Sequence, residues 1–225
     1  MDFDNNARVS ITPLITFVES TERRKLSIVK EQKKPSLIKV APYATARAAM
    51  KRFIKDGFDE ECIYAAINKL HIKQKDTIWS KNNAVNSIEA LRHFIGMNFP
   101  HLVGKIHCSF SKAIIKDCQI RDVNVTVAPD LILRWEDNGK RYVGAIKFRI
   151  AKNKLSFSAG RNAASLISYY LRQSVAESDE IVDNTHCLFV DVMNDVIYPA
   201  PTDISHSLDV ISNACYEYST IWNAA

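Results

Sequence analysis

The chain has 225 residues, of which 47% are hydrophobic and 24% are charged, and its formal net charge is +5. These values are ordinary for a globular protein, and no apolar run approaches the roughly 20 residues that a membrane-spanning helix needs. The five cysteines are scattered and form no CxxC pair, so the sequence indicates neither a zinc knuckle nor a disulfide framework. Together with the lack of a signal-peptide pattern, this cysteine usage favours a cytoplasmic protein.

The first 80 residues predict a basic region of short amphipathic helices. Thr12-Pro13 and Ser20-Thr21 are typical helix starts, while Pro42 opens a third helix and Asp59 a fourth. In the third helix, five apolar residues fall on one face at helical spacing: Ala46, Ala49, Met50, Phe53 and Ile54. We expect residues 1–80 either to pack on the rest of the chain or to form a small lobe that binds nucleic acid.

Residues 84–225 predict an α/β domain. A helix from residue 84 is followed by strands over 107–115, 120–135 and 141–150, a helix from 158, strands over 185–192 and 196–201, and a closing helix. Asn138-Gly139 is the pair that two-residue hairpin turns favour. This order of elements predicts a mixed β-sheet flanked by helices.

Charge is segregated along the chain. Residues 20–55 carry eleven Lys or Arg and two Glu, a formal charge of +9, and residues 138–176 carry eight Lys or Arg and no acid. Residues 173–225 carry nine acids and neither Lys nor Arg. Basic stretches of this kind are typical of proteins that bind polyanions, so we expect nucleic acid as the partner. The alternative is that the basic and acidic segments attract each other inside the fold.

The hairpin around Asn138-Gly139 carries the candidate site. Side chains alternate across a strand, so Asp130 and Arg134 share one face, and Lys147 shares a face with Ala145 on the next strand. In an antiparallel hairpin, Asp130 and Lys147 converge, with Arg134 as the rival ionic partner of Asp130. The opposite face of the first strand is expected to hold Val123, Val125, Val127, Leu131 and Leu133.

This arrangement resembles the PD-(D/E)XK nuclease superfamily, which has a restriction-endonuclease-like core. Pro129-Asp130 matches its proline-aspartate, Ala145-Ile146-Lys147 stands where the family has (D/E)-x-K, and the resemblance covers residues 84–201. It implies that Asp130 binds Mg²⁺ and that Lys147 orients the attacking water or offsets negative charge at the phosphate. The second metal-binding carboxylate is replaced by Ala145, which has no ligand atom.

Three explanations of this replacement are open. In the first, Glu89 on the preceding helix supplies the missing acid; Asp130 and Glu89 are then the metal ligands, and Asp130, Lys147 and Glu89 the catalytic residues. In the second, the domain is inactive but still binds DNA or a partner, and Ala145 is either natural or an engineered replacement of a glutamate. In the third, the match arises by chance and the hairpin is ordinary.

The residues expected to contact phosphate lie in the two basic segments. They are Arg149, Lys152, Lys154, Arg161, Arg23, Arg24 and Lys25. The leading interpretation is a magnesium-dependent nuclease, or a DNA-binding protein derived from one, acting as a monomer or a homodimer. The alternative is a scaffold without catalytic activity, which binds nucleic acid through the basic region and a protein through the acidic C-terminal region.

Overall fold

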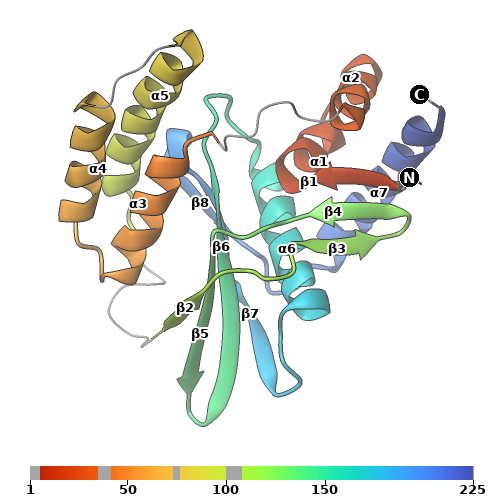
Figure 1. The fold of residues 1–225 in the computed structure, drawn as a ribbon. Coiled ribbons are helices and arrows are strands. Elements are labelled where there is room, and N and C mark those ends of the chain that lie inside the picture. Colours follow the sequence, from red (N-terminus) through yellow and green to blue (C-terminus); the bar gives the residue numbers. More distant parts are fainter. Residues whose placement is uncertain (1–5, 35–41, 73–76, 100–107, 225) are drawn as a thin grey trace.

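The computed structural model describes residues 6–34, 42–72, 77–99 and 108–224 (Figure 1). Its helices are α1 Ile11–Val18, α2 Glu22–Lys33, α3 Ala44–Lys55, α4 Glu61–Ile72, α5 Ile78–Ile95, α6 Phe157–Ser174 and α7 Ser205–Ala224. Its strands are β1 Ala7–Ser10, β2 Ser109–Ser111, β3 Asp117–Ile120, β4 Val123–Thr126, β5 Leu131–Asp137, β6 Lys140–Arg149, β7 Glu180–Asp191 and β8 Val196–Pro199, with a 3-10 turn at Val192–Asn194. The predicted α/β class is confirmed; the restriction-endonuclease-like core stays a prediction.

The strands form two mixed sheets. The larger sheet has the order β2-β5-β6-β7-β8, with β6 and β7 parallel and the other neighbours antiparallel. Helix α6 connects β6 to β7, as a parallel pair requires a crossover connection. The smaller sheet has the order β1-β4-β3, and its strand β1, which the sequence did not predict, pairs parallel with β4.

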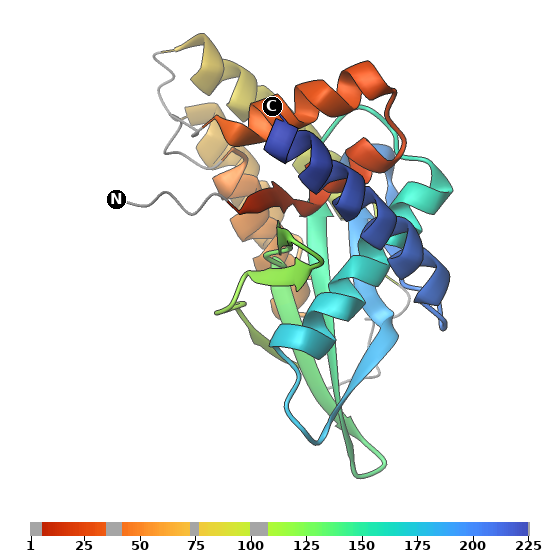
Figure 2. The same ribbon diagram turned by 90° about the vertical axis from the view of Figure 1, so that its right-hand side faces the viewer.

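Helices cover both faces of the large sheet (Figure 2). Helices α3, α4 and α5 lie on one side, and α1, α6 and α7 lie with the small sheet on the other (Figure 1). Each side has its own hydrophobic cluster, and each cluster draws on residues before position 80 as well as after position 84. The division of the chain into regions 1–80 and 84–225 stays a prediction, but the early helices pack on the sheet.

Alternation along β6 explains how one strand serves both clusters. Ile146, Phe148 and Ile150 pack toward α3–α5, whereas Val143 and Ala145 pack toward α6. A strand that is covered on both faces carries apolar residues on both faces. Accordingly, β6 and β7 each contain a run of consecutive buried residues. None of the described helices is both long and apolar enough to cross a membrane.

The predicted strand over residues 120–135 is wrong in one respect. It is divided between the two sheets, with β4 ending at Thr126 and β5 starting at Leu131. Ala128 between them has φ +42°, a left-handed conformation that is unfavourable for a residue with a Cβ, and Pro129 follows it. Because the chain turns here, Val125 packs toward α6 and Leu131 packs toward α3–α5, not on the common face that alternation predicted.

The hairpin turn is as predicted. Strands β5 and β6 pair antiparallel, with Asp137 opposite Lys140, and Asn138 and Gly139 connect them with φ of +49° and +70°. Positive φ at both central residues is what a type I′ turn requires, and it explains the Asn-Gly pair. A two-residue turn fixes the register of the hairpin, so it also fixes which residue faces Lys147.

We expect Gly144→Ala to destabilise the fold by about 1–3 kcal/mol, because the added methyl group overpacks a close strand contact. A Cβ at Gly144 would lie 2.7 Å from the backbone oxygen of His186 on β7, which cannot move without disturbing the sheet. Gly96→Ala is the matched control, since the nearest atom to its Cβ would be 3.5 Å away. Chemical denaturation of both variants tests this expectation, and equal stabilities would contradict it.

Candidate functional site

Asp130 lies at the start of β5, next to the break between the two sheets. Its backbone N–H donates to the carbonyl oxygen of Ile146 at 2.8 Å, which extends the β5–β6 ladder by one residue. One carboxylate oxygen accepts from the backbone N–H of Phe148 at 2.9 Å. Arg47 Nη1 on α3 donates to both carboxylate oxygens, at 2.9 and 2.8 Å. The Asp130 side chain is only 9% exposed, so this contact with Arg47 is largely shielded from water.

Lys147 lies on β6 opposite the start of β5, where Asp130 stands, and the charge of Asp130 acts on it; no ion pair joins the two side chains among the described contacts. Its Nζ donates at 2.6 Å to the carbonyl oxygen of Ala128, the residue with the left-handed backbone. Burial lowers the pKa of Lys147 to about 8; Asp130 opposes this shift and Arg47 adds to it. The structure thus brings together a carboxylate, a guanidinium and a lysine with a lowered pKa beside a strained backbone residue. Such combinations are more frequent at functional sites than elsewhere.

Arg47 is the member of this group that the sequence did not identify. It lies 83 positions before its partner, within a basic stretch where nothing local distinguishes it from its neighbours. The rival ionic partner predicted for Asp130 was Arg134, and this prediction is wrong. Arg134 Nε binds Glu180 at 2.7 Å instead.

The position of Ala145 corresponds to the carboxylate of the (D/E)-x-K tripeptide. Its side chain is 0% exposed and lies in the cluster under α6, on the same face of β6 as Lys147. Glu89, the residue expected to replace that carboxylate, has a cationic partner of its own, because Lys152 Nζ lies 2.8 Å from its Oε2. A role of Glu89 as a metal ligand therefore stays a prediction.

The oxygen atoms around Asp130, as they are arranged, do not form a binding site for Mg²⁺. This cation prefers six oxygen ligands, usually including one or two carboxylates, whereas both oxygens of Asp130 are bound by Arg47. In the part of the chain that the structure describes, no group of three or more His, Cys, Asp or Glu could hold a metal ion. The guanidinium of Arg47 supplies the positive charge that a cation would bring to Asp130.

Arg149 was expected to contact phosphate, and the structure corrects this expectation. Its side chain is 3% exposed, and its Nη1 donates at 2.8 Å to Asp191, which is fully buried. Its Nη2 donates to the backbone and side-chain oxygens of Asn153, at 2.7 and 2.9 Å. Although Arg149 alternates in phase with Lys147, its guanidinium is held inside the protein and is not presented to a ligand at the surface.

The other predicted phosphate contacts differ in accessibility. On α2, Arg23 is exposed and Arg24 binds Glu31 at the surface, whereas Lys25 is 13% exposed and lies 2.6 Å from Glu217 on α7. After β6, Lys152 and Lys154 are exposed. Arg161 on α6 stacks over the ring of Phe157, at 5.5 Å from its centroid.

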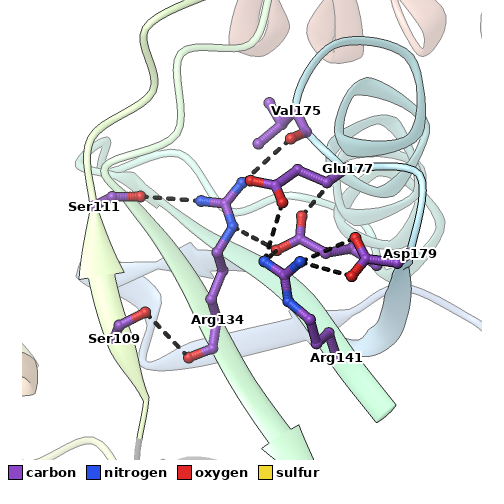
Figure 3. Close-up of polar contacts among 8 residues, drawn as sticks. Ser109, Ser111, Arg134, Arg141, Val175, Glu177 and Asp179 are labelled. Carbon is purple, nitrogen blue, oxygen red and sulfur yellow. Dashed lines mark hydrogen bonds and ion pairs between the residues drawn. The ribbon is translucent and has the colours of Figure 1, made fainter.

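Two arginines of the hairpin pair with the acidic C-terminal segment. Arg134 binds Glu180, and Arg141 lies 2.7 Å from Asp179 and 3.1 Å from Glu177 (Figure 3). Opposite charges from segments about 40 residues apart thus meet at this end of the sheet.

Most of the acids in residues 173–225 are used within the fold. Five of the nine form ion pairs with a described Lys or Arg: Glu177, Asp179, Glu180, Asp191 and Glu217. Asp183 and Asp195 are hydrogen-bonded to His186 and His93. This is the internal attraction between basic and acidic segments that the sequence left open. It leaves only part of the acidic segment for an external partner.

We expect the stability of the protein to depend on Lys147 between pH 7 and pH 10. The folded-state pKa of about 8 lies below the ordinary 10.5, so in this window the unfolded chain retains a proton that the folded chain has lost, and stability rises with pH. Relative to Lys147→Met, the parent should gain about 2 kcal/mol from pH 7 to pH 10. Chemical denaturation of both proteins at each pH measures this, and a constant difference between them would contradict it.

The sequence matches no family model and no curated protein.

Proposed function

We propose that this protein binds nucleic acid through a site like that of PD-(D/E)XK nucleases, in which Arg47 takes the place of a metal ion at Asp130. The observation that carries the proposal is the placement of Asp130 and Lys147 on facing strands, with Arg47 held against the carboxylate. In this interpretation the restriction-endonuclease-like core serves binding, and Ala145 marks the loss of phosphodiester cleavage.

The guanidinium of Arg47 has capacity for a phosphate. Only its Nη1 is used by Asp130; its Nε and Nη2 have no hydrogen-bond partner in the described part of the chain, and the side chain is 27% exposed. Arginine donates in a planar fork that matches phosphate oxygens. Lys147, which is partly charged near pH 8, provides a second positive charge close enough to interact with Asp130 and Arg47. Arg23 and Lys154 are exposed and add positive charge to the protein surface.

The competing scaffold hypothesis receives less support. It requires the acidic C-terminal region to bind a protein, but five of its nine acids already form ion pairs with Lys or Arg residues of this chain. A ligand at those acids would have to displace internal arginines such as Arg134 and Arg149.

Anisotropy titrations of labelled single- and double-stranded DNA test the proposal. We expect affinity to fall steeply between 50 and 200 mM salt, because each neutralised phosphate releases counterions. Arg47→Met should weaken binding by about tenfold, the loss expected for one charge-assisted contact. Arg52→Met on the same helix is the control, because Arg52 is 69% exposed and pairs with Asp56 at the surface; its effect should be small.

Three outcomes would count against the proposal. Absence of binding at low salt would remove the nucleic-acid partner altogether. Equal losses of affinity for Arg47→Met and Arg52→Met would show that DNA does not bind at the Asp130 site. If the parent protein cleaves DNA with Mg²⁺ and Asp130→Asn does not, the protein is an active nuclease. Glu89 would then again be the candidate for the second metal-binding carboxylate.

A further inference from the structure

A second site lies at the N-terminal end of α6, and its lining includes neither Asp130 nor Lys147. It is a groove of about 420 Å³ between the end of α1, the first turns of α6 and the first turns of α7. Sites for small molecules in proteins have volumes of about 300–1,000 Å³. The groove is therefore large enough for a small organic ligand.

Two largely buried polar residues line this groove. Asn162 on α6 is 8% exposed and Ser207 on α7 is 7% exposed. Neither side chain forms a hydrogen bond within the residues that the structure describes. Their polar atoms are accessible from the groove, because among the described residues Arg149 Nε is the only fully buried side-chain nitrogen or oxygen without a partner. An asparagine amide can both donate and accept hydrogen bonds. A ligand in the groove would complete the hydrogen bonds of both residues.

The groove presents both signs of charge. Arg161 is positive, stacks on Phe157, and makes no ion pair with any described residue. Glu19 at the end of α1 is negative and accepts hydrogen bonds from the hydroxyl groups of Ser156 and Ser158, at the start of α6. The N-terminus of a helix attracts anions, and at α6 the carboxylate of Glu19 already occupies this place. Asp203 adds a second carboxylate to the lining. A purely anionic ligand would be repelled by Glu19 and Asp203, and a purely cationic ligand by Arg161.

We infer that the groove binds a small zwitterion of the amino-acid class, as a free amino acid or a dipeptide. The ligand's carboxylate binds Arg161, its ammonium binds Glu19, and its amide or carboxylate oxygens complete the hydrogen bonds of Asn162 and Ser207. The exposed ring of Phe157 and the side chain of Val210 supply an apolar wall, which favours an apolar ligand side chain. The inference is independent of the proposed nucleic-acid site.

Calorimetry on the full chain with L-leucine, L-phenylalanine and leucyl-leucine tests the inference. We expect at least one of them to bind with a Kd of about 1 mM or tighter. N-acetyl-leucine lacks the ammonium group and leucinamide lacks the carboxylate, so each should bind at least about tenfold more weakly than leucine. Comparing leucine with leucyl-leucine distinguishes a free amino acid from a dipeptide.

Variants locate the site. Arg161→Met and Glu19→Gln should each abolish the preference for the zwitterion over the derivative that lacks the matching charge. Lys140→Met, which removes an exposed cation at the distant hairpin turn, should leave binding unchanged. Circular dichroism confirms that each variant is folded. If a variant does not fold, the three charge forms of leucine still decide the question on the parent protein.

No binding of any zwitterion at 10 mM would overturn the inference, since about 10 mM is already weaker than a specific small-molecule site requires. Binding of N-acetyl-leucine or leucinamide as tight as that of leucine would also overturn it, because the paired charges would then not be recognised.

Discussion

Asp191→Asn is expected to lower the free energy of unfolding by about 3–5 kcal/mol, among the largest effects of a single substitution in this protein. Asp191 is 0% exposed and its partner Arg149 is 3% exposed, with 2.8 Å between Oδ1 and Nη1. Removing the carboxylate charge leaves the guanidinium buried without compensation. Arg149 Nε already lacks a hydrogen-bond partner among the described residues, so the guanidinium could satisfy its N–H groups only by leaving the interior.

Asp179→Asn is the matched control for this experiment. Asp179 also pairs with an arginine, at 2.7 Å from Arg141, but it is 60% exposed and Arg141 is 42% exposed. Exposed pairs contribute little because water and salt screen them, so we expect a loss below about 1 kcal/mol. Guanidinium denaturation gives both values. Equal losses would show that burial does not isolate the Arg149–Asp191 pair from water.

Ala145→Glu is expected to make the stability of the protein depend on Mg²⁺. Without the ion, the buried carboxylate should destabilise the fold by about 3 kcal/mol, moderated by the ammonium group of Lys147 two positions along the same face. With millimolar Mg²⁺, the new carboxylate and Asp130 provide the two acids that the superfamily uses. The ion should then recover about 2 kcal/mol, or roughly 5 °C in melting temperature.

Ala145→Gln separates the charge of the new side chain from its size. Glutamine fills the same volume but is a much poorer ligand for a hard cation, so its melting temperature should not respond to Mg²⁺. Thermal melts with Mg²⁺ and with a chelator measure the response in the parent and both variants, and a plasmid-nicking assay detects restored cleavage. An equal response of the two variants, or no response of Ala145→Glu in a folded protein, would argue against a disabled nuclease site.

The sequence could not predict which charged residues pair with each other in the fold. Arg47 binds Asp130 across 83 positions, and Lys25 binds Glu217 across 192. Charge segregation indicated that opposite segments could attract each other, but it could not tell a buried arginine such as Arg149 from an exposed lysine such as Lys154. The choice between them depends on which neighbours cover each side chain, and those neighbours come from other elements.

The sequence by itself determined the local features. Helical spacing placed Ala46 and Phe53 on the buried face of α3, and Asn138-Gly139 fixed the hairpin and brought Asp130 opposite Lys147. These features depend on backbone dihedrals and on residues a few positions apart.

Only the tertiary structure decided the rest. Strand β1 has four residues and exists by pairing with β4, more than 100 positions away. The expected continuous strand over 120–135 turns at Ala128 because two sheets, each with its own pairing partners, meet there. The contact between Arg47 and Asp130 forms because α3 packs on the face of the sheet where the hairpin begins. Such contacts follow from the packing of whole elements, which no short stretch of sequence specifies.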